Sequence, residues 1–196
     1  MQNTQESKLK EQSESMLKIF EKAKTDLTLR EELQKDPLAV LNKIGIDVED
    51  TFKQIVSRQL ESLARFGFSD QLPTNAEIKT SVLTETPADF TFSANGWGVV
   101  LTCNETATQK IENGLNVVAA ISAAVAASAA YLSAAEISFI AACFSAFCWG
   151  YASTIGLVDQ GNGVYLTITW IQIAITMANP ALGPASLTPI PTAVTN

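Results

Sequence analysis

The first third of the chain spaces its apolar residues as amphipathic helices do. Residues 5–23 are polar and helix-prone, with a few large apolar side chains among them. Leu29 and Leu33 share one helical face, and Asp26 or Thr25 can cap the start of that helix. The pattern predicts two consecutive helices with a short break between them.

Asp36 and Pro37 mark the start of the next helix. Asp36 suits the N-cap, and Pro37 in the first turn gives up a backbone amide that would have no partner there. Apolar residues then recur at intervals of three, and Gly45 ends the helix in the left-handed conformation typical of that position. A further amphipathic helix is predicted over residues 50–66, and Gly67 stops it.

The second half of the chain begins with a strand pattern. Residues 90–92 and 99–102 predict two strands around the turn signal Asn-Gly-Trp-Gly of residues 95–98. Asn104 then caps a helix that we expect to continue through alanine-rich sequence to about Leu132.

The remaining sequence predicts a second apolar helix and a long strand. Ser133 and Glu136 have the spacing of a capping box, and the helix that they open runs to about Leu157. Residues 164–176 are apolar on both faces, as in a strand buried on each side. The tail after Met177 is rich in Pro, Ala, Thr and Ser, so we expect it to be extended and irregular.

Together these elements predict an α+β fold, in which a helical N-terminal leader precedes an alanine-rich helical hairpin flanked by a few antiparallel strands. The expected organisation is a charged, leader-like helical region at residues 1–68, a linker at 69–89 and an apolar domain at 90–196. Pro73 and Pro87, with scattered Thr and Ser and no apolar period, favour the linker.

Charge divides the chain near the same place. All 13 basic residues lie between Lys8 and Lys110, whereas from Asn113 onward only Glu136 and Asp159 are charged. The net charge of -7 and the lack of a basic C-terminal patch argue against nucleic acid as a partner, because phosphate must be neutralised by Lys and Arg.

The start of the chain resembles no secretory signal. Residues 1–18 are polar and charged and lack the apolar core that a signal peptide needs. We therefore expect synthesis in the cytoplasm, followed by export through a non-classical leader.

The sequence offers no group of residues suited to catalysis, a metal or a cofactor. It contains no His, which is the commonest general base. Cys103, Cys143 and Cys148 lack the spacing of a zinc site and a base partner, so we interpret them as small buried apolar residues. A disulfide from Cys103 to one of the other two is the alternative, in an oxidising compartment. The prediction is a protein that is not an enzyme.

The alanine-rich hairpin is the candidate membrane-active segment. Residues 117–157 span 41 positions with Glu136 as their only charge, enough for two helices of about 20 apolar residues. No basic residues flank the segment, which disfavours a standing two-pass anchor. A soluble form that inserts its hairpin and a soluble domain with the hairpin as its core both remain open. The candidate insertion residues are Val117, Val118, Ile121, Val125, Ile137, Phe139, Ile140, Phe144, Phe147 and Trp149.

Residues 20–47 carry a resemblance to a known family. The residues that carry it are Leu29-Arg30-Glu31-Glu32-Leu33, Lys35-Asp36-Pro37, Leu41 and Gly45-Ile46-Asp47-Val48. They resemble the nitrile hydratase-like leader peptide family, helical leaders on precursors of bacterial peptide natural products. The resemblance implies recognition by a modifying enzyme or a peptidase-containing ABC exporter. The recognition residues would be Leu29, Leu33, Asp36, Pro37, Leu38, Leu41, Ile44 and Gly45.

The C-terminal half is similar to a group of small uncharacterised bacterial proteins through residues 97–104 and 163–170, which implies an architecture only. Our leading hypothesis is a leader-bearing secreted precursor whose C-terminal domain attacks a target membrane, as an antimicrobial bacteriocin or pore-forming toxin does. A natural-product precursor modified on Ser, Thr and Cys is one alternative. A soluble partner-binding protein with a buried hairpin is another, and a homo-oligomer is compatible with each.

Overall fold

The computed structural model describes residues 2–66, 89–128, 132–178 and 189–194 of the chain. Their contacts divide them into two compact units. The helical unit contains the described residues up to 66, together with Asn95–Gly98 and Thr169–Ala178. The sheet unit contains the remaining described residues, most of them in Val99–Ile168. Each unit is described by itself.

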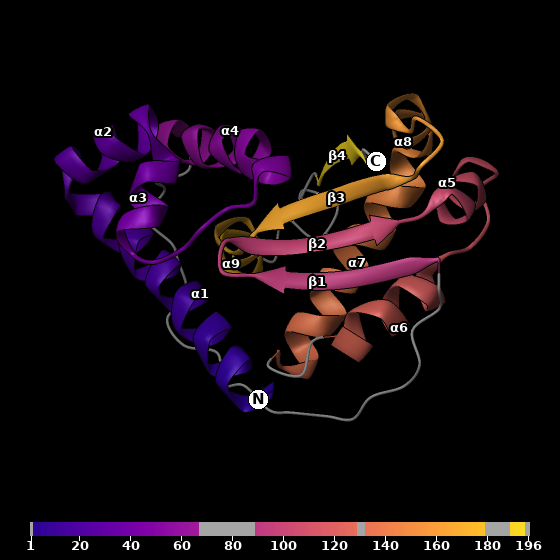
Figure 1. The fold of residues 1–196 in the computed structure, drawn as a ribbon, viewed down its shortest axis with the longest axis horizontal. Helices are drawn as coiled ribbons and strands as arrows, with labels where there is room; N and C mark the ends of the chain where they lie inside the picture. Colours follow the sequence, from indigo (N-terminus) through magenta and orange to yellow (C-terminus); the bar gives the residue numbers. More distant parts are fainter. Residues whose placement is uncertain (1, 67–88, 129–131, 179–188, 195–196) are drawn as a thin grey trace. The chain divides into compact units, whose positions relative to one another are not determined.

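The helical unit begins with four helices whose ends follow the predicted caps. They are α1 (Gln2–Thr25), α2 (Leu27–Lys35), α3 (Pro37–Lys43) and α4 (Asp50–Phe66) (Figure 1). Asp26 Oδ1 accepts a hydrogen bond from Leu29 N at 3.1 Å, and Asp36 Oδ1 accepts one from Ala39 N at 3.0 Å. Gly45 has φ +75° and ends α3 as expected. The predictions for these four helices are confirmed, but Gly67, the expected stop of α4, lies outside the described residues.

The four helices pack their apolar faces into one core. Each contributes at least one large side chain with 2% or less of its surface exposed. These side chains are Met16 and Phe20 from α1, Leu33 from α2, Leu41 from α3 and Leu60 from α4. Burial of such a side chain stabilises a fold by about 1.5–3 kcal/mol, so tertiary packing holds the short helices α2 and α3 in place.

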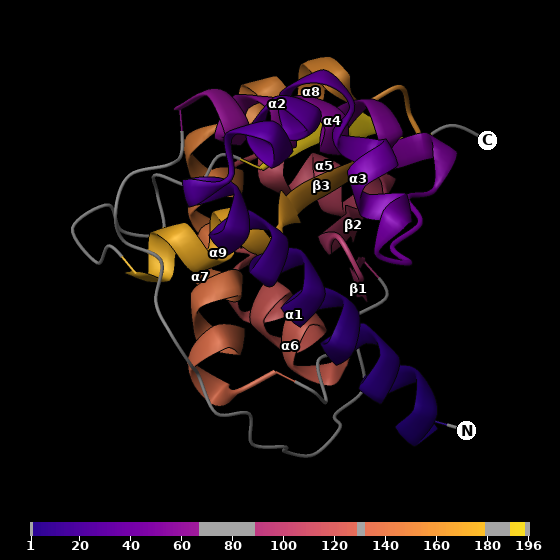
Figure 2. The same cartoon turned by 90° about the vertical axis from the view of Figure 1, so that its left-hand side faces the viewer.

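The last element of the helical unit corrects the prediction of a long strand at residues 164–176. Only Val164–Thr169 forms a strand (β3), and the chain then turns into helix α9 (Trp170–Ala178). Thr169 N donates to Gln172 Oε1 at 3.0 Å, and Gln172 N donates to Thr169 Oγ1 at 3.4 Å, which is a capping box. Helix α9 packs beside α1 (Figure 2). A local cap and a tertiary contact therefore override the strand preference of the segment.

The sheet unit is built on a four-stranded antiparallel sheet in the order β1-β2-β3-β4 (Figure 1). Strands β1 (Phe90–Asn95) and β2 (Gly98–Cys103) form the predicted hairpin. Strand β4 (Ile190–Ala193) pairs antiparallel with β3, with Val164 opposite Ala193. The expectation of an irregular tail is therefore wrong for β4. Its Pro191 is tolerated because β4 lies at the edge of the sheet.

The predicted helix from Asn104 to about Leu132 is wrong in its length. Asn104 caps α5 (Glu105–Glu112), and the next helix, α6, begins at Val118 (Val118–Ser128). Gly114 has φ +68°, and Leu115 N donates to Lys110 O at 2.9 Å, which is the Schellman pattern of a helix end. The Asn-Gly pair at 113–114 is therefore the stop signal.

The second apolar helix is also broken. The capping box of Ser133 and Glu136 is confirmed at the start of α7 (Ala134–Gly150). At Tyr151 the chain bends by 82° into α8 (Ala152–Val158). Helix α8 packs on α5, where a Cβ at Gly156 would lie 1.6 Å from Glu112 Oε1. The bend thus allows α8 to pack closely on α5, and the helical periodicity of the sequence does not reveal this tertiary contact.

The hairpin of α6 and α7 covers one face of the sheet (Figures 1 and 2). The rings of Phe92 on β1 and Phe144 on α7 meet edge to face, with centroids 6.5 Å apart. Ile121, Val125 and Ile140 from the two helices have no exposed surface. The predicted α+β fold, with a helical hairpin beside antiparallel strands, is confirmed.

Gly161 and Gly163 provide a matched test of the packing before β3. Both have positive φ, +85° and +92°, so an alanine is strained at either position. A Cβ at Gly163 would lie 2.1 Å from Cys103 O, whereas nothing lies within 4 Å of one at Gly161. Gly161→Ala should lower the free energy of unfolding by about 1–2 kcal/mol, and Gly163→Ala by about 1–3 kcal/mol more. Equal losses in urea unfolding would contradict the close approach.

Candidate functional site

The turn between β1 and β2 is held within the helical unit by the start of α4. Trp97 has no exposed surface. Its Nε1 donates a hydrogen bond to Glu49 Oε2 at 3.2 Å, and its ring centroid lies 5.4 Å from that of Phe52. Glu49 directly precedes α4 and Phe52 lies in its first turn. One short segment therefore contacts both the indole nitrogen and the ring of Trp97.

A second indole ties the same turn to α9. Trp170 Nε1 donates to Asn95 O at 2.8 Å, and Trp170 N donates to Trp97 O at 3.3 Å. Gly96 lies against α1, since a Cβ there would be 2.7 Å from Gln12 Oε1. Within the helical unit, residues 95–98 and helix α9 contact helices α1 and α4. We call this set of contacts the clasp.

The clasp joins the predicted leader to two pieces of the predicted C-terminal domain. The helical unit holds residues 95–98 and 169–178, both of which the sequence assigns to the domain at 90–196. The predicted linker at 69–89 lies outside the described residues except for Asp89, so that boundary stays a prediction. The clasp holds these segments together through apolar burial and hydrogen bonds.

Only three of the eight predicted leader-recognition residues lie in the core of the helical unit. Leu33, Pro37 and Leu41 are buried, and Leu29, Leu38 and Ile44 are half-buried. Asp36 and Gly45 are exposed at the two ends of α3. Leu27, which is 67% exposed at the start of α2, was missed by sequence reasoning. Of the predicted recognition residues, Asp36 and Gly45 are therefore the ones exposed on the surface of this unit.

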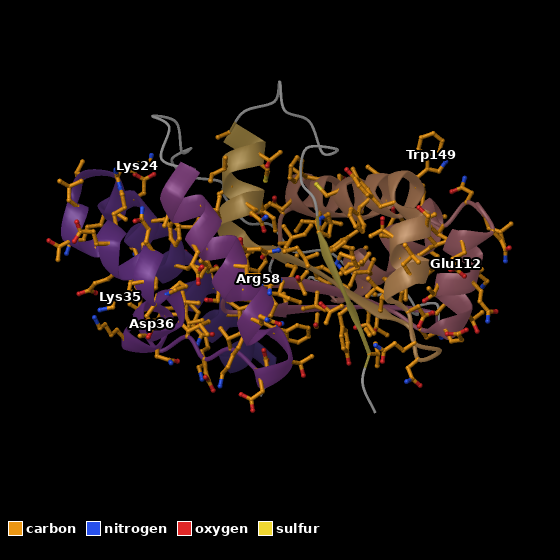
Figure 3. The ribbon with its side chains drawn as sticks, turned by 90° about the horizontal axis from the view of Figure 1, so that it is seen from above. Lys24, Lys35, Asp36, Arg58, Glu112 and Trp149 are labelled. Carbon is orange, nitrogen blue, oxygen red and sulfur yellow. The ribbon has the colours of Figure 1, made fainter. Side chains whose placement is uncertain are left out.

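Most of the predicted insertion residues are used inside the sheet unit. Ile121, Val125, Ile140, Phe144, Phe147 and Val117 are buried, and Ile137 and Phe139 are half-buried. Val118 is exposed, and Trp149 has 87% of its surface exposed. Figure 3 shows the Trp149 indole directed outward at the edge of the unit. The periodicity of the hairpin did not reveal that Tyr151 and Leu157 are exposed as well.

The lengths of the apolar helices bear on membrane insertion. Among the described residues, no single helix is both long and apolar enough to cross a membrane. Helices α7 and α8 meet the length and composition together, but the chain bends by 82° between them.

The three thiols are buried and free. A hydrogen bond with the Cys148 side chain, together with burial, raises the pKa of Cys103 well above its usual range. Burial raises the pKa of Cys143 to about 12. Thiols in this state are weak nucleophiles at neutral pH, because the thiolate is the reactive form. Of the two disulfide partners left open by the sequence, Cys148 lies beside Cys103.

Comparisons with models of known protein families, with curated protein sequences and with solved structures found no match. The resemblances of residues 20–47 and of the C-terminal half therefore stay predictions. In the part of the chain that the structure describes, no three His, Cys, Asp or Glu side chains are grouped to hold a metal ion.

A double-mutant cycle tests the polar contact of the clasp. Trp97→Phe keeps an aromatic ring but removes the donor to Glu49, and Glu49→Ala removes the acceptor. Urea unfolding should give a coupling energy of about 1 kcal/mol between the two changes. The exposed Glu31 on α2 supplies the control, and Glu31→Ala should not couple to Trp97→Phe. A coupling of zero in the first cycle would rule out the hydrogen bond.

The raised thiol pKa values predict a loss of stability in alkali. Thiols of the unfolded chain ionise near their usual pKa of 9.0, whereas folding holds Cys143 protonated up to about 12. Stability is therefore fully present below about pH 9 and falls as the pH rises toward the folded value. Urea midpoints at about pH 8 and about pH 10.5 should show this fall, and Cys143→Ala should make it smaller. An identical fall in the variant would refute the assignment.

Proposed function

We propose that the chain is a leader-bearing secreted precursor whose C-terminal half acts on membranes, as a bacteriocin or pore-forming protein does. Its N-terminal helices would hold that half inactive until they are released. They would also present the chain to a peptidase-containing ABC exporter or a modifying enzyme. The clasp is the observation that carries this proposal.

Release of the N-terminal helices would expose a group of large apolar side chains. Trp97, Trp170, Ile171 and Ile173 each have 8% or less of their surface exposed. Exposing each one to water costs about 1.5–3 kcal/mol, which together is comparable with the whole stability of a typical domain, about 5–15 kcal/mol. Insertion into a lipid bilayer would again remove these side chains from water. Release therefore supplies a driving force for insertion that the intact chain lacks.

Charge supports the same division of roles. The N-terminal helices carry most of the basic residues and many of the carboxylates, whereas the chain from Asn113 onward carries two charges. The N-terminal helices thus supply most of the charge that keeps the apolar half in water.

A second candidate is a soluble partner-binding protein with the hairpin as its core. The burial of Ile121, Ile140 and Phe144 in the sheet unit favours this alternative. In that case the clasp is ordinary packing and its release leads only to unfolding.

Cleavage in situ distinguishes the two candidates. A recognition sequence for a site-specific protease is inserted within the predicted linker, and the full chain is mixed with dye-loaded vesicles. Membrane activity predicts no leakage before the protease is added and leakage after it. The same chain with a scrambled insertion should stay silent throughout. Cleavage followed by removal of the N-terminal fragment, without leakage at any pH, would contradict the membrane proposal and favour the partner-binding protein.

A further inference from the structure

We infer that the intact chain meets a lipid bilayer at the bend between α7 and α8, before any cleavage, and that it prefers zwitterionic phosphatidylcholine. Trp149 and Tyr151 at the bend and Leu157 near the end of α8 would make this contact, and these three residues are called the corner. The inference rests on the proposed function and identifies the lipid and the residues that touch it first.

The corner presents large apolar side chains to solvent. Trp149 and Leu157 are each 87% exposed, and Tyr151 is 45% exposed. The Tyr151 ring stacks on Phe147, with centroids 4.8 Å apart and planes at 15°. This stacking fixes Tyr151 against the end of α7, so the corner is a preformed feature of the bend rather than a loose loop.

The helices around the corner expose no charge. Surface helices of soluble proteins normally carry charged residues on their outer face. The exposed residues of α7, α8 and the bend are Ala134, Ala135, Ser138, Ala142, Trp149, Gly150, Tyr151, Ser153, Thr154 and Leu157. Glu136, the one carboxylate on α7, accepts a hydrogen bond from Ser133 N at 2.8 Å in the capping box.

The charges nearby decide which lipid fits. Lys110 is the only basic residue among the described residues of the sheet unit, and it is paired with Asp89. Glu112 is exposed on α5, the helix that packs against α8 (Figure 3). Within the described part of the sheet unit, an anionic headgroup would therefore meet a neighbouring carboxylate and no unpaired cation, whereas anionic lipids are recognised by clusters of Lys and Arg. A zwitterionic headgroup avoids this repulsion.

The kind of side chain favours a bilayer over a protein partner. Trp and Tyr are enriched at the level of lipid headgroups, because an amphipathic ring suits a region that is apolar on one side and wet on the other. A specific protein interface typically carries about ten direct hydrogen bonds between the partners. The short neutral side chains beside the corner offer few groups for such bonds, and a fluid bilayer does not require them.

Tryptophan fluorescence of the intact chain tests the inference directly. Trp97 has no exposed surface and Trp170 is 8% exposed, so acrylamide in water quenches mainly Trp149. Phosphatidylcholine vesicles should shift the emission to shorter wavelength and protect Trp149 from acrylamide. Leu157→Ser should weaken vesicle binding by about 3- to 10-fold. Leu27→Ser, at the exposed leucine of the helical unit, is the matched control and should leave binding unchanged.

Several results would overturn the inference. Trp149 could stay accessible to acrylamide at saturating vesicle concentration, or Leu27→Ser could weaken binding as much as Leu157→Ser. Tighter binding to phosphatidylglycerol vesicles would refute the choice of lipid. Protection of Trp149 without vesicles, with a dimer in sedimentation, would assign the corner to a second copy of the chain.

The outcome separates this inference from the proposed function. One outcome is leakage after cleavage together with a Trp149 that stays accessible to acrylamide in the intact chain. This outcome would refute the lipid contact at the corner but would still agree with the proposed precursor function. Protection of Trp149 in the intact chain, without leakage after cleavage, would support the corner and contradict the proposed function.

Discussion

The burial of Trp97 is the contact on which the helical unit depends. Its indole contacts Glu49 and Phe52 at the start of α4. Its backbone carbonyl oxygen accepts a hydrogen bond from Trp170 N, with 3.3 Å between the two atoms. One residue therefore links the turn, α4 and α9. Helix α9 has only nine residues, and five of them are Ile, Thr or Trp, which are moderate helix formers at best, so packing against α1 has to sustain it. Without the N-terminal helices, α9 keeps its cap and loses this support.

The two charged residues of the chain after Asn113, Glu136 and Asp159, both hold backbone groups in place. Glu136 completes the capping box of α7. Asp159 Oδ1 accepts hydrogen bonds from Gly161 N at 3.0 Å and Gly163 N at 2.9 Å. Burial raises the pKa of Asp159, but the hydrogen bonds from these amides outweigh it and hold the pKa below its usual range. The carboxylates thus shape the chain locally, and the outer faces of α7 and α8 are left uncharged.

The sequence alone predicts those structural features that depend on residues close together in the chain. The caps at Asp36 and Ser133 were predictable, because a cap needs only a side chain and the amide three residues on. The strand predicted at residues 164–176 was wrong beyond its sixth residue. Alternating apolar residues in one segment carry no information about a helix elsewhere in the chain that packs against that segment. The bend between α7 and α8 was missed for the same reason. The partnership of Trp97 with Glu49, 48 residues away, has no local signal, so the candidate site emerges only from the fold.

Amide hydrogen exchange in α9 tests the central claim most directly. The full chain carrying a cleavable linker is compared before cleavage and after removal of the N-terminal fragment. If the clasp sustains α9, the peptide Trp170–Ala178 loses its protection on removal, while α6 (Val118–Ser128) in the sheet unit keeps its own. Unchanged protection of Trp170–Ala178 after removal would contradict the account, since α9 would then be held by something other than the N-terminal helices.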